Sequence, residues 1–311
     1  MKAIRLHKRG GPEQLVFEDA PVPEPKADEA RVRVHAAAIT PTELTWPATY
    51  KFPDGRERLP SIPAHEVSGV VEALGSDATE VGIGEAVYGL IDFPHDGCAA
   101  EYATGRAADL APKPRTIDHV HAAAVPLSGL TAWQALFDHA KIQSGQHVLI
   151  HGAAGGVGSY AVQLARWKGA HVVATASAQH AALLRELGVE RFIDYATTRF
   201  EDVVKNVDAV FDTVGGDTPE RSWPVLKPGG TLVSIVPNPS HEEARAQGIR
   251  CIFFIVNPSR RQLGRIAELI DAGHVRPIVA AVVPLAQTRA AFERGLAGHN
   301  RGKFVLRVVD D

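Results

Sequence analysis

Short apolar stretches that alternate with polar positions dominate the first third of the chain. The segment Arg31-Val32-Arg33-Val34-His35 has the period of two that is typical of a strand with one buried face. Glycines bound two further apolar stretches, Val67 to Leu74 and Ala86 to Leu90. This pattern predicts bent strands of a small barrel-like domain.

The pattern changes near His121, where apolar strand-like runs begin to alternate with helical patterns. Such alternation is typical of βαβ units and of a parallel sheet covered by helices. We therefore expect an α/β protein with a β-rich domain from residues 1–122 and 272–311 and a doubly wound parallel-sheet domain over residues 123–271. Ser259 is expected to cap a helix that runs through Ile270, and Gly302 to Val308 to return to the first domain as a strand.

A glycine-rich segment follows the predicted strand Val148 to Ile150 and opens the next predicted helix. Ala153, Gly155 and Gly158 stand there in G/A-x-G-x-x-G register, which indicates a turn that binds a dinucleotide pyrophosphate at a helix N-terminus. The alternative is a tight strand-to-helix turn without a ligand. The candidate cofactor-binding residues of this turn are Ala153, Ala154, Gly155, Gly156, Val157 and Gly158.

The end of the next predicted strand decides between NADH and NADPH. An NAD enzyme usually has Asp or Glu there, whereas this chain has no carboxylate before Glu186. Ser177 can donate a hydrogen bond to a 2′-phosphate, so NADPH is the expected cofactor. The candidate residues at this position are Thr175, Ala176, Ser177 and His180.

Composition narrows the classes of partner and location. The net charge of −3 gives the chain no general attraction to nucleic acid or to anionic membranes. Cys98 and Cys251 are the two cysteines, which excludes a disulfide framework and a four-thiolate zinc lobe. The N-terminus is charged where a signal peptide is apolar, and no run of ~18 apolar residues occurs. We expect a cytoplasmic protein that binds neither nucleic acid nor a membrane.

Six sequence blocks in the same order give the chain a resemblance over its full length to the medium-chain dehydrogenase/reductase superfamily, and within it to the zinc-free quinone oxidoreductases. The resemblance implies a twisted-barrel, GroES-like substrate domain and a Rossmann-type domain, with the active site between them. The blocks are Pro63 to Val71, Pro126 to Trp133, Ala153 to Gly158, Ile193 to Tyr195, Phe211 to Gly216 and Gly302 to Leu306.

The same resemblance argues against a catalytic metal. Zinc members of the superfamily hold the metal with three residues, and the matching positions here are Thr40, His65 and Leu127. One imidazole does not make a tight zinc site, which needs three protein ligands. We therefore expect no metal.

Further cofactor-binding residues follow from the resemblance. Tyr195 is expected near the adenosine ribose or its phosphate, and Thr131 near the nicotinamide. The remaining candidates lie at predicted strand ends, where open α/β sheets bind ligands, or in the late Gly-Lys pair. They are Val214, Gly215, Ser234, Ile235, Phe254, Val256, Gly302 and Lys303.

The substrate wall is expected in the segment that begins at Thr40. Trp46 and Tyr50 are candidates for stacking on a flat conjugated acceptor, and packing under a loop is the alternative. Thr42 matches the position of a hydroxyl proton relay in zinc alcohol dehydrogenases and is the candidate proton donor. The candidate substrate-binding residues are Thr40, Trp46, Tyr50, His65 and Phe254.

Without a metal to stabilise an alkoxide, reduction of a quinone or an α,β-unsaturated carbonyl compound is easier than oxidation of a simple alcohol. The sequence therefore predicts an NADPH-dependent reductase of these compounds. Two alternatives stay open: an NADPH-binding sensor or structural protein with little turnover, and an enoyl-thioester reductase. The second needs a basic surface for a phosphopantetheine or coenzyme A tail, for which the candidates are Arg56, Arg58, Arg260 and Arg261.

Assembly is predicted from one apolar run, Cys251 to Val256, which reads as a strand at a sheet edge. An unpaired edge strand of this kind promotes aggregation. Pairing with a second copy across a two-fold axis removes the open edge, so a homodimer is expected.

Overall fold

The computed structural model describes residues 1–237, 241–298 and 300–309. Contacts divide the chain into two compact units. Unit 1 contains Met1–Leu127, Asn257–Gly273 and the chain from Pro277 onward, and unit 2 contains Ser128–Val256 and His274–Arg276. No helix in the described part is long and apolar enough to cross a membrane.

Unit 1 is built on one large sheet and a separate two-stranded ribbon. In the large sheet, β14, β15, β3, β4, β5 and β7 follow one another in this order, and β6 also pairs with β3. The ribbon joins β1 and β2 antiparallel. The strands are β1 (Lys2–Leu6), β2 (Leu15–Asp19), β3 (Glu29–Ile39), β4 (Glu66–Leu74), β5 (Ala86–Leu90), β6 (Tyr102–Arg106), β7 (Leu110–Pro112), β14 (Val279–Pro284) and β15 (Lys303–Arg307).

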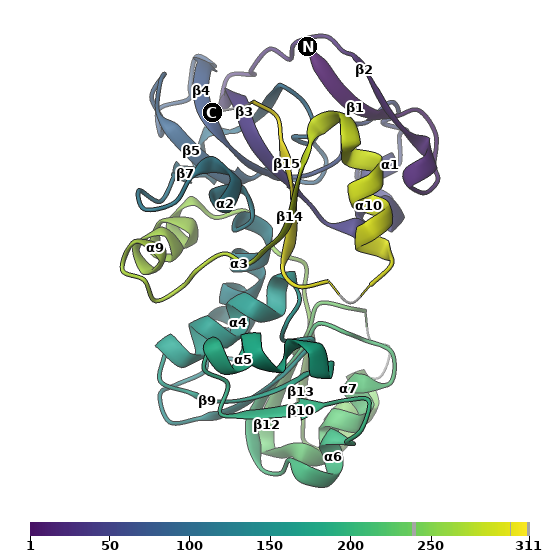
Figure 1. Cartoon of the computed structure of the whole chain (residues 1–311), viewed down its shortest axis with the longest axis vertical. Coiled ribbons are helices and arrows are strands. Elements are labelled where there is room, and N and C mark those ends of the chain that lie inside the picture. Colours follow the sequence, from purple (N-terminus) through teal and green to yellow (C-terminus); the bar gives the residue numbers. More distant parts are fainter. Residues whose placement is uncertain (238–240, 299, 310–311) are drawn as a thin grey trace. The chain divides into compact units, whose positions relative to one another are not determined.

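The central strand of unit 1 is β3, which is antiparallel to β4, β6 and β15. Its alternating segment places Val32 and Val34 in the core, as the period of two predicts. Figure 1 shows the C-terminal strands β14 and β15, in yellow, beside the N-terminal β3, in purple. The predicted return of Gly302 to Val308 as a strand is confirmed, because β15 pairs with β3.

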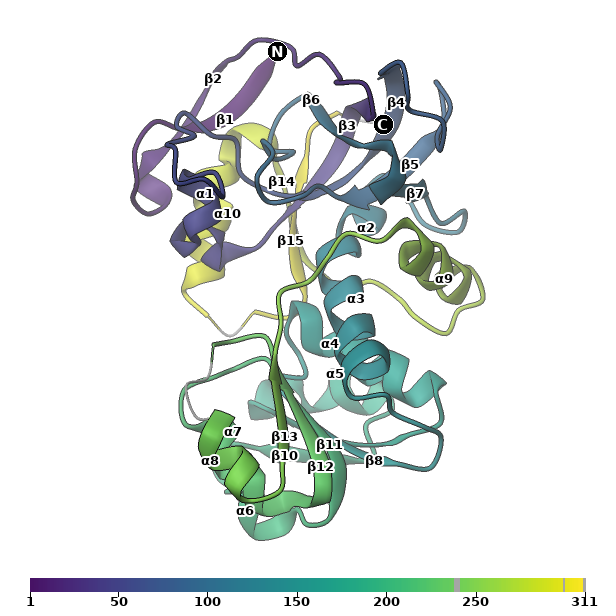
Figure 2. The ribbon, with the colours of Figure 1, turned by 180° about the vertical axis from the view of Figure 1, so that it is seen from behind.

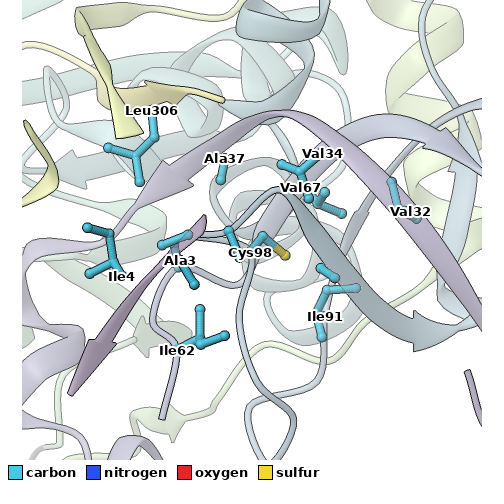
Figure 3. Packing of buried hydrophobic residues seen from close by; sticks show 14 of the residues in the cluster. Ala3, Ile4, Val32, Val34, Ala37, Ile62, Val67, Ile91, Cys98 and Leu306 are labelled. Carbon is cyan, nitrogen blue, oxygen red and sulfur yellow. The ribbon is translucent and has the colours of Figure 1, made fainter. Parts of the chain in front are cut away.

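The core of unit 1 is made of small and β-branched side chains from distant parts of the sequence. Figure 3 shows Val34, Val67, Ile91 and Leu306 gathered around the buried Cys98. These five side chains are at most 1% exposed. The same cluster contains alanines such as Ala3, Ala37 and Ala64, whose small side chains let neighbouring segments approach closely.

Short helices and 3-10 turns complete unit 1, and one longer helix covers β7. They are η1 (Pro12–Gln14), η2 (Pro41–Thr45), α1 (Pro47–Tyr50), η3 (Ala107–Asp109), α2 (His119–Ala123), α3 (Pro126–Trp133), which continues into unit 2, α9 (Arg260–Asp271), η7 (Leu285–Gln287) and α10 (Thr288–Leu296).

The helix α9 belongs to unit 1, whereas the sequence placed it in the parallel-sheet domain. Tyr88 of β5 donates a hydrogen bond to the carbonyl of Leu263 at 2.7 Å, and Asp271 accepts one from the Thr116 backbone at 3.0 Å. These contacts tie both halves of α9 to unit 1. Ser259 caps the helix as expected, since its hydroxyl accepts from Gln262 N.

Unit 2 contains a six-stranded parallel sheet in the order β10, β9, β8, β11, β12, β13. Numbered along the chain, this order is 3-2-1-4-5-6, that of a Rossmann fold. Figure 2 shows β11, β12 and β13, with α8 beside β13. The strands are β8 (His147–His151), β9 (His171–Ala176), β10 (Arg191–Asp194), β11 (Val207–Asp212), β12 (Leu226–Ser234) and β13 (Arg250–Phe253).

The helices of unit 2 connect consecutive strands, so the predicted α/β class and parallel sheet are confirmed. A π-helix, η4, follows α3 directly. The helices are η4 (Gln134–His139), α4 (Gly156–Trp167), η5 (Ala178–His180), α5 (Ala181–Glu186), α6 (Phe200–Val203), α7 (Thr218–Ser222), η6 (Trp223–Val225) and α8 (His241–Ala246).

One residue before β4 has an unfavourable backbone conformation. Ala64 has φ 68°, in the left-handed region that strains a residue with a Cβ. Its N–H donates to Glu43 Oε1 at 2.8 Å, which helps to hold the strained geometry. The chain therefore stores strain next to His65.

We expect Ala64→Gly to stabilise the protein by about 0.5–1 kcal/mol, because relief of the left-handed strain exceeds the added entropy of the unfolded glycine. Chemical denaturation measures the difference. The matched control is Ala73→Gly within β4, where extended backbone gains nothing from glycine and a loss of about 0.5–1 kcal/mol is expected. Equal losses in both variants would contradict the assignment of strain to Ala64.

Candidate functional site

The turn after β8 has the geometry of a phosphate-binding turn. The helix α4 begins at Gly156, with Gly155 as its N-cap residue. The first N–H groups of a helix have no acceptor within it and are free to bind an anion. Ala153 and Ala154 are buried, whereas Gly155, Gly156 and Val157 are partly exposed. The exposed part of the turn is therefore its helix-opening half.

Two glycines make this turn possible. Gly152 has φ 68°, and a Cβ there would lie 2.3 Å from Thr213 Oγ1. A Cβ on Gly158 would lie 2.2 Å from the Gly152 carbonyl oxygen and 2.7 Å from Ala153 Cα. Gly158 thus allows α4 to pack closely on the turn, while the tight bend falls on Gly152, one residue before Ala153, the first residue of the predicted register. The backbone cradle fits a dinucleotide pyrophosphate.

The loop after β11 lies beside this turn, because β8 and β11 are neighbours in the sheet. Thr213 Oγ1 donates to the carbonyl of His151 at 2.8 Å. Asp212 is fully buried and accepts hydrogen bonds from the N–H groups of Val214 and Gly215 and from Ser234 Oγ. Asp212 therefore fixes the loops after β11 and β12 at the point where the strand order reverses.

A buried histidine, His151, joins the end of β8 to β9 and α7 through hydrogen bonds. His151 Nδ1 lies 2.9 Å from Thr175 Oγ1, and its Nε2 lies 3.0 Å from Ser222 Oγ. Ser222 Oγ donates to the Thr218 carbonyl, so it accepts from His151 and fixes the Nε2–H tautomer. Burial lowers the pKa of His151 to about 3, so the ring is neutral. The sequence assigns no role to His151, whose partners Thr175 and Ser222 lie 24 and 71 residues away, or to the bond between Asp212 and Ser234, 22 residues apart.

The residues expected near the cofactor 2′ position occupy two adjacent strand ends. The Tyr195 N–H, after β10, donates to the Ala176 carbonyl at 3.4 Å, so the segments that contain Ser177 and Tyr195 lie side by side. Ser177 is partly exposed and the Tyr195 side chain is 55% exposed. His180 is 9% exposed, with Nε2 at 3.3 Å from Gln179 Nε2. Ser177 and Tyr195 are therefore the accessible members of this set.

The other cofactor candidates of unit 2 differ in exposure. Val214 is 55% exposed and Ile235 is partly exposed, both beyond strand ends. The buried candidates are Thr131, Thr175, Gly215, Ser234, Phe254 and Val256. Phe254 packs its ring against His139 at 4.5 Å between centroids, which gives it a structural contact within unit 2.

In unit 1, three strand ends bring polar side chains together. Thr40 follows β3, Glu66 begins β4 and Lys303 begins β15. Lys303 Nζ pairs with Glu66 Oε1 and donates to Thr40 Oγ1 at 3.1 Å. Glu66 Oε2 also accepts from the Leu127 N–H at 3.0 Å. Glu66 and Lys303 are 1% and 6% exposed, so this is a buried ion pair.

A second pair lies close by and carries no charge at neutral pH. Glu43 Oε1 lies 3.4 Å from His65 Nε2, and both residues are buried. Burial raises the pKa of Glu43 to about 8, against the opposing effects of the Ala64 N–H and Lys303. Burial and the nearby Arg58 lower the pKa of His65 to about 3. The contact therefore joins a carboxylic acid to a neutral imidazole.

The aromatic wall of unit 1 differs from the expected one. Trp46 is partly buried and contacts Phe93 edge-on at 5.3 Å, and Phe93 contacts His65 in the same way. Tyr50 is 2% exposed, with its hydroxyl donating to the Leu44 carbonyl at 2.7 Å and Arg9 over its ring. The stacking role of Tyr50 is corrected to a packing role, and Phe93 joins Trp46 as an aromatic candidate.

Thr42, the predicted proton donor, lies on the exposed side of η2. Its carbonyl accepts a hydrogen bond from Thr45 Oγ1 at 2.7 Å. Its neighbour Thr40 contacts the buried ion pair instead.

The donor set of unit 1 does not fit zinc. Among residues 1–237, 241–298 and 300–309 no group of three His, Cys, Asp or Glu residues is placed to hold a metal ion. His65 Nε2 lies 3.4 Å from Glu43 Oε1, whereas Glu66 pairs with the Lys303 ammonium. A tight zinc site needs three protein ligands.

The arginines considered for a thioester tail do not converge. Arg58 lies in a cavity of about 600 Å³ with His95 and Asp96 and donates to the carbonyls of Ala48, Phe93 and His95. Arg260 and Arg261 line a different cavity, beside Asp109, and Arg56 pairs with Asp54. The structure thus gives no basic surface that combines the four.

Comparison with known families and proteins agrees with this geometry. Residues 26–115 match the family described as alcohol dehydrogenase GroES-like domain, and residues 187–306 match the zinc-binding dehydrogenase family. A probable zinc-binding oxidoreductase, mitochondrial, from Arthroderma benhamiae is 31% identical, covering 95% of this chain and 93% of that protein. A chloroplastic NADPH-dependent alkenal/one oxidoreductase from Arabidopsis thaliana is 32% identical over 99% of this chain and 80% of its own length.

The fold is also similar to a solved structure. The quinone oxidoreductase from Coxiella burnetii superposes with a TM-score of 0.92 and 34% sequence identity, and the match covers 99% of each chain. The expected Rossmann-type domain and GroES-like domain are thereby confirmed.

The glycine turn is testable through Gly158→Ala. A Cβ at this position meets backbone atoms that cannot rotate away, so we expect a loss of about 1–3 kcal/mol in the free energy of unfolding and weaker NADPH binding. Denaturation and the fluorescence of bound NADPH measure the two effects. The helical control is Gly264→Ala in α9, where a Cβ meets nothing within 4 Å and a gain of up to about 1 kcal/mol is expected. Unchanged NADPH binding in a folded Gly158→Ala protein would refute the role of the turn.

Proposed function

Because the chain belongs to the medium-chain dehydrogenase/reductase superfamily, we propose that it is an NADPH-dependent, zinc-independent reductase of quinones or α,β-unsaturated carbonyl compounds. Homologues of this chain are NAD(P)H oxidoreductases, and its class as an oxidoreductase follows from them. The observation that carries the finer proposal is a phosphate-binding turn in a protein whose donor set in unit 1 does not fit zinc.

The preference for NADPH rests on the end of β9. Ser177, which has no carboxylate beside it in β9 or η5, is partly exposed next to the segment of Tyr195. In this proposal the two side chains hold the 2′-phosphate, and the N–H groups of Gly156, Val157 and Gly158 hold the pyrophosphate. The name of the Arabidopsis relative, an NADPH-dependent enzyme, supports the same cofactor.

Further residues of unit 2 complete the cofactor site in this proposal. Asp212 and His151 keep the loops around it rigid through buried hydrogen bonds. Thr131, Val214, Ile235 and Ser234 are proposed near the bound dinucleotide. When bound, NADPH supplies a hydride to the acceptor.

The acceptor class follows from the charge that the reaction creates. Hydride addition to a quinone or an enone leaves a negative charge that is delocalised towards an oxygen atom. Hydrogen-bond donors suffice to stabilise such an anion, whereas a simple alcohol needs a metal or an activated acid/base pair. Trp46 and Phe93 offer aromatic surface for a flat conjugated acceptor. The names of the Coxiella and Arabidopsis relatives, a quinone oxidoreductase and an alkenal/one oxidoreductase, support these two classes.

The proposal is tested by mixing the protein with NADPH and, in parallel, a 1,4-quinone, a short enone and no acceptor, and following NADPH absorbance. We expect acceptor-dependent oxidation of NADPH with at least one of the two compounds, and a lower kcat/KM when NADH replaces NADPH. Tight NADPH binding without turnover of either acceptor would contradict the reductase and favour a binding protein. Equal kcat/KM values for NADH and NADPH would contradict only the cofactor preference.

We also propose that the protein is a cytoplasmic homodimer. Among the described strands of unit 2, β13 lies at one edge of the sheet, and Ile255 just after it is 64% exposed. The strand is shorter than the predicted run, since it ends at Phe253. Pairing of β13 with a second copy would cover this edge. Both cysteines are free thiols, which suits a reducing compartment.

Light scattering at micromolar concentration tests the dimer, and a mass near twice 33.3 kDa is expected. The Phe254 N–H donates to the Ser234 carbonyl, so the Phe253 N–H points to the opposite, open side of β13. Phe253→Pro removes this N–H and is expected to shift the mass towards the monomer. A monomeric mass for the unaltered protein would reject the dimer without affecting the proposed reaction.

A further inference from the structure

The strongest unassigned feature is the polar cluster at one edge of the sheet in unit 1. Because β3 is antiparallel to both β4 and β15, the end of β3 meets the starts of the other two strands. The register that pairs Phe304 with Ile39 continues to place Lys303 opposite Thr40. Three residues from distant parts of the chain, Thr40, Glu66 and Lys303, are thereby held together by the fold.

Within this cluster Thr40 is the residue that is partly exposed. Glu66 and Lys303 are 1% and 6% exposed, whereas Thr40 is partly exposed. Its oxygen accepts a hydrogen bond from Lys303 Nζ at 3.1 Å. A hydroxyl has one proton to donate, and no acceptor for the Thr40 proton occurs among the described residues. The Lys303 ammonium therefore polarises the Thr40 hydroxyl, whose own proton is available for donation.

A purely structural role explains the cluster less well. An ion pair taken out of water is no more stabilising than well-packed apolar side chains of the same volume. Here the second oxygen of Glu66 accepts a hydrogen bond from the Leu127 N–H, which fixes the orientation of the carboxylate. The carboxylate in turn fixes the position of the Lys303 ammonium. The arrangement is costly and rigid, which suits a preorganised electrostatic group.

The neighbouring pair of Glu43 and His65 is a weaker candidate for the same task. Glu43 is 1% exposed, and its Oε1 is engaged by the Ala64 N–H and lies against the imidazole. Neither group reaches the surface of unit 1 as Thr40 does. Thr42 is exposed, and no Lys or Arg in the described part of the chain donates a hydrogen bond to its hydroxyl.

We propose that the Thr40 hydroxyl, polarised by Lys303 and held through Glu66, donates a hydrogen bond and then a proton to the carbonyl oxygen of the acceptor. This inference rests on the proposed reductase function. In this donor set, which does not fit a metal, the cation that stabilises the oxygen anion is Lys303, acting through the Thr40 hydroxyl.

The proton and electron balance is as follows for an enone. The hydride brings an electron pair to the β-carbon, the C=C π bond breaks, and the carbonyl π electrons move on to oxygen. The oxygen forms its O–H bond with the Thr40 proton as the Thr40 O–H bond breaks. Lys303 returns a proton to Thr40, and the Lys303 amine is reprotonated from water after product release. The enol becomes the ketone in water, and a quinone gives the hydroquinone by the same transfers.

The first test compares Thr40→Val with Thr40→Ser and the unaltered protein. We expect Thr40→Val to lower kcat/KM by about 100-fold, as for loss of one oxyanion donor, and Thr40→Ser to keep most of the activity. The NADPH dissociation constant stays within two-fold, since the cofactor turn lies in unit 2. Thr45→Val, which removes a hydroxyl from the same turn η2, is the matched control and leaves kcat/KM unchanged.

A series of acceptors separates proton donation from a structural role, because a structural role of Thr40 would not change how kcat/KM depends on the acceptor. Electron-poor quinones stabilise their own anions, whereas electron-rich quinones and enones depend on the donor. Thr40→Val should therefore lose more activity with the electron-rich acceptors, and the plot of log kcat/KM against acceptor reduction potential should become steeper. The double variant Lys303→Met with Glu66→Gln, which leaves no buried charge unpaired, should steepen it in the same direction.

Three outcomes separate the claims. No turnover of quinone or enone by the unaltered protein overturns the proposed function. If the unaltered protein turns over and Thr40→Val keeps the same kcat/KM and slope, the role of Thr40 is overturned, but the proposed function is not. A uniform loss across the acceptor series, with the same slope, also overturns it and assigns Thr40 to packing. If Thr40→Val does not fold by circular dichroism, Thr40→Ala is put through the same series.

Discussion

The buried ion pair between Lys303 and Glu66 joins the last strand of the chain to its first third, and the arrangement of unit 1 depends on it. Removing one partner of such a pair leaves an uncompensated buried charge, at a cost of about 3–5 kcal/mol. The pair holds β15 and β4 on either side of β3 and places an ammonium group behind Thr40. Gly302, with φ 77° and its Cα close to the Ile278 carbonyl, is the turn that lets Lys303 reach this position.

The same charge distribution explains why the chemistry of this edge differs from that of a zinc enzyme. Glu43 is a neutral acid and His65 a neutral base, and neither adds a charge to this edge. The charges next to Thr40 are those of the Lys303 ammonium and the Glu66 carboxylate. A dication beside this ammonium would meet repulsion and at most two ligands. We propose that such an edge suits acceptors whose reduction spreads the new charge over several atoms.

Local patterns predicted the fold well, and long-range contacts account for what they missed. The glycine turn, the parallel strands, the Ser259 cap and the return of β15 all follow from signals within a few neighbouring residues. The unit to which α9 belongs depends on Tyr88, 175 residues away from Leu263. Tyr50 resembled a stacking residue in sequence, but Arg9 and the Leu44 carbonyl engage it in the fold. The contact of Trp46 with Phe93, the bond between Ser234 and Asp212 and the pairing of Glu66 with Lys303 were not predicted either, because each joins residues that lie far apart in the sequence.

The proposed reaction needs no metal ion, and the metal content of the active protein decides whether this holds. Plasma mass spectrometry of purified protein, on the same sample that is assayed with NADPH and a quinone, gives zinc per chain and turnover together. We expect far less than one zinc per chain at full turnover. About one zinc per chain, with turnover lost on its removal and restored by added zinc, would show that the protein depends on the metal.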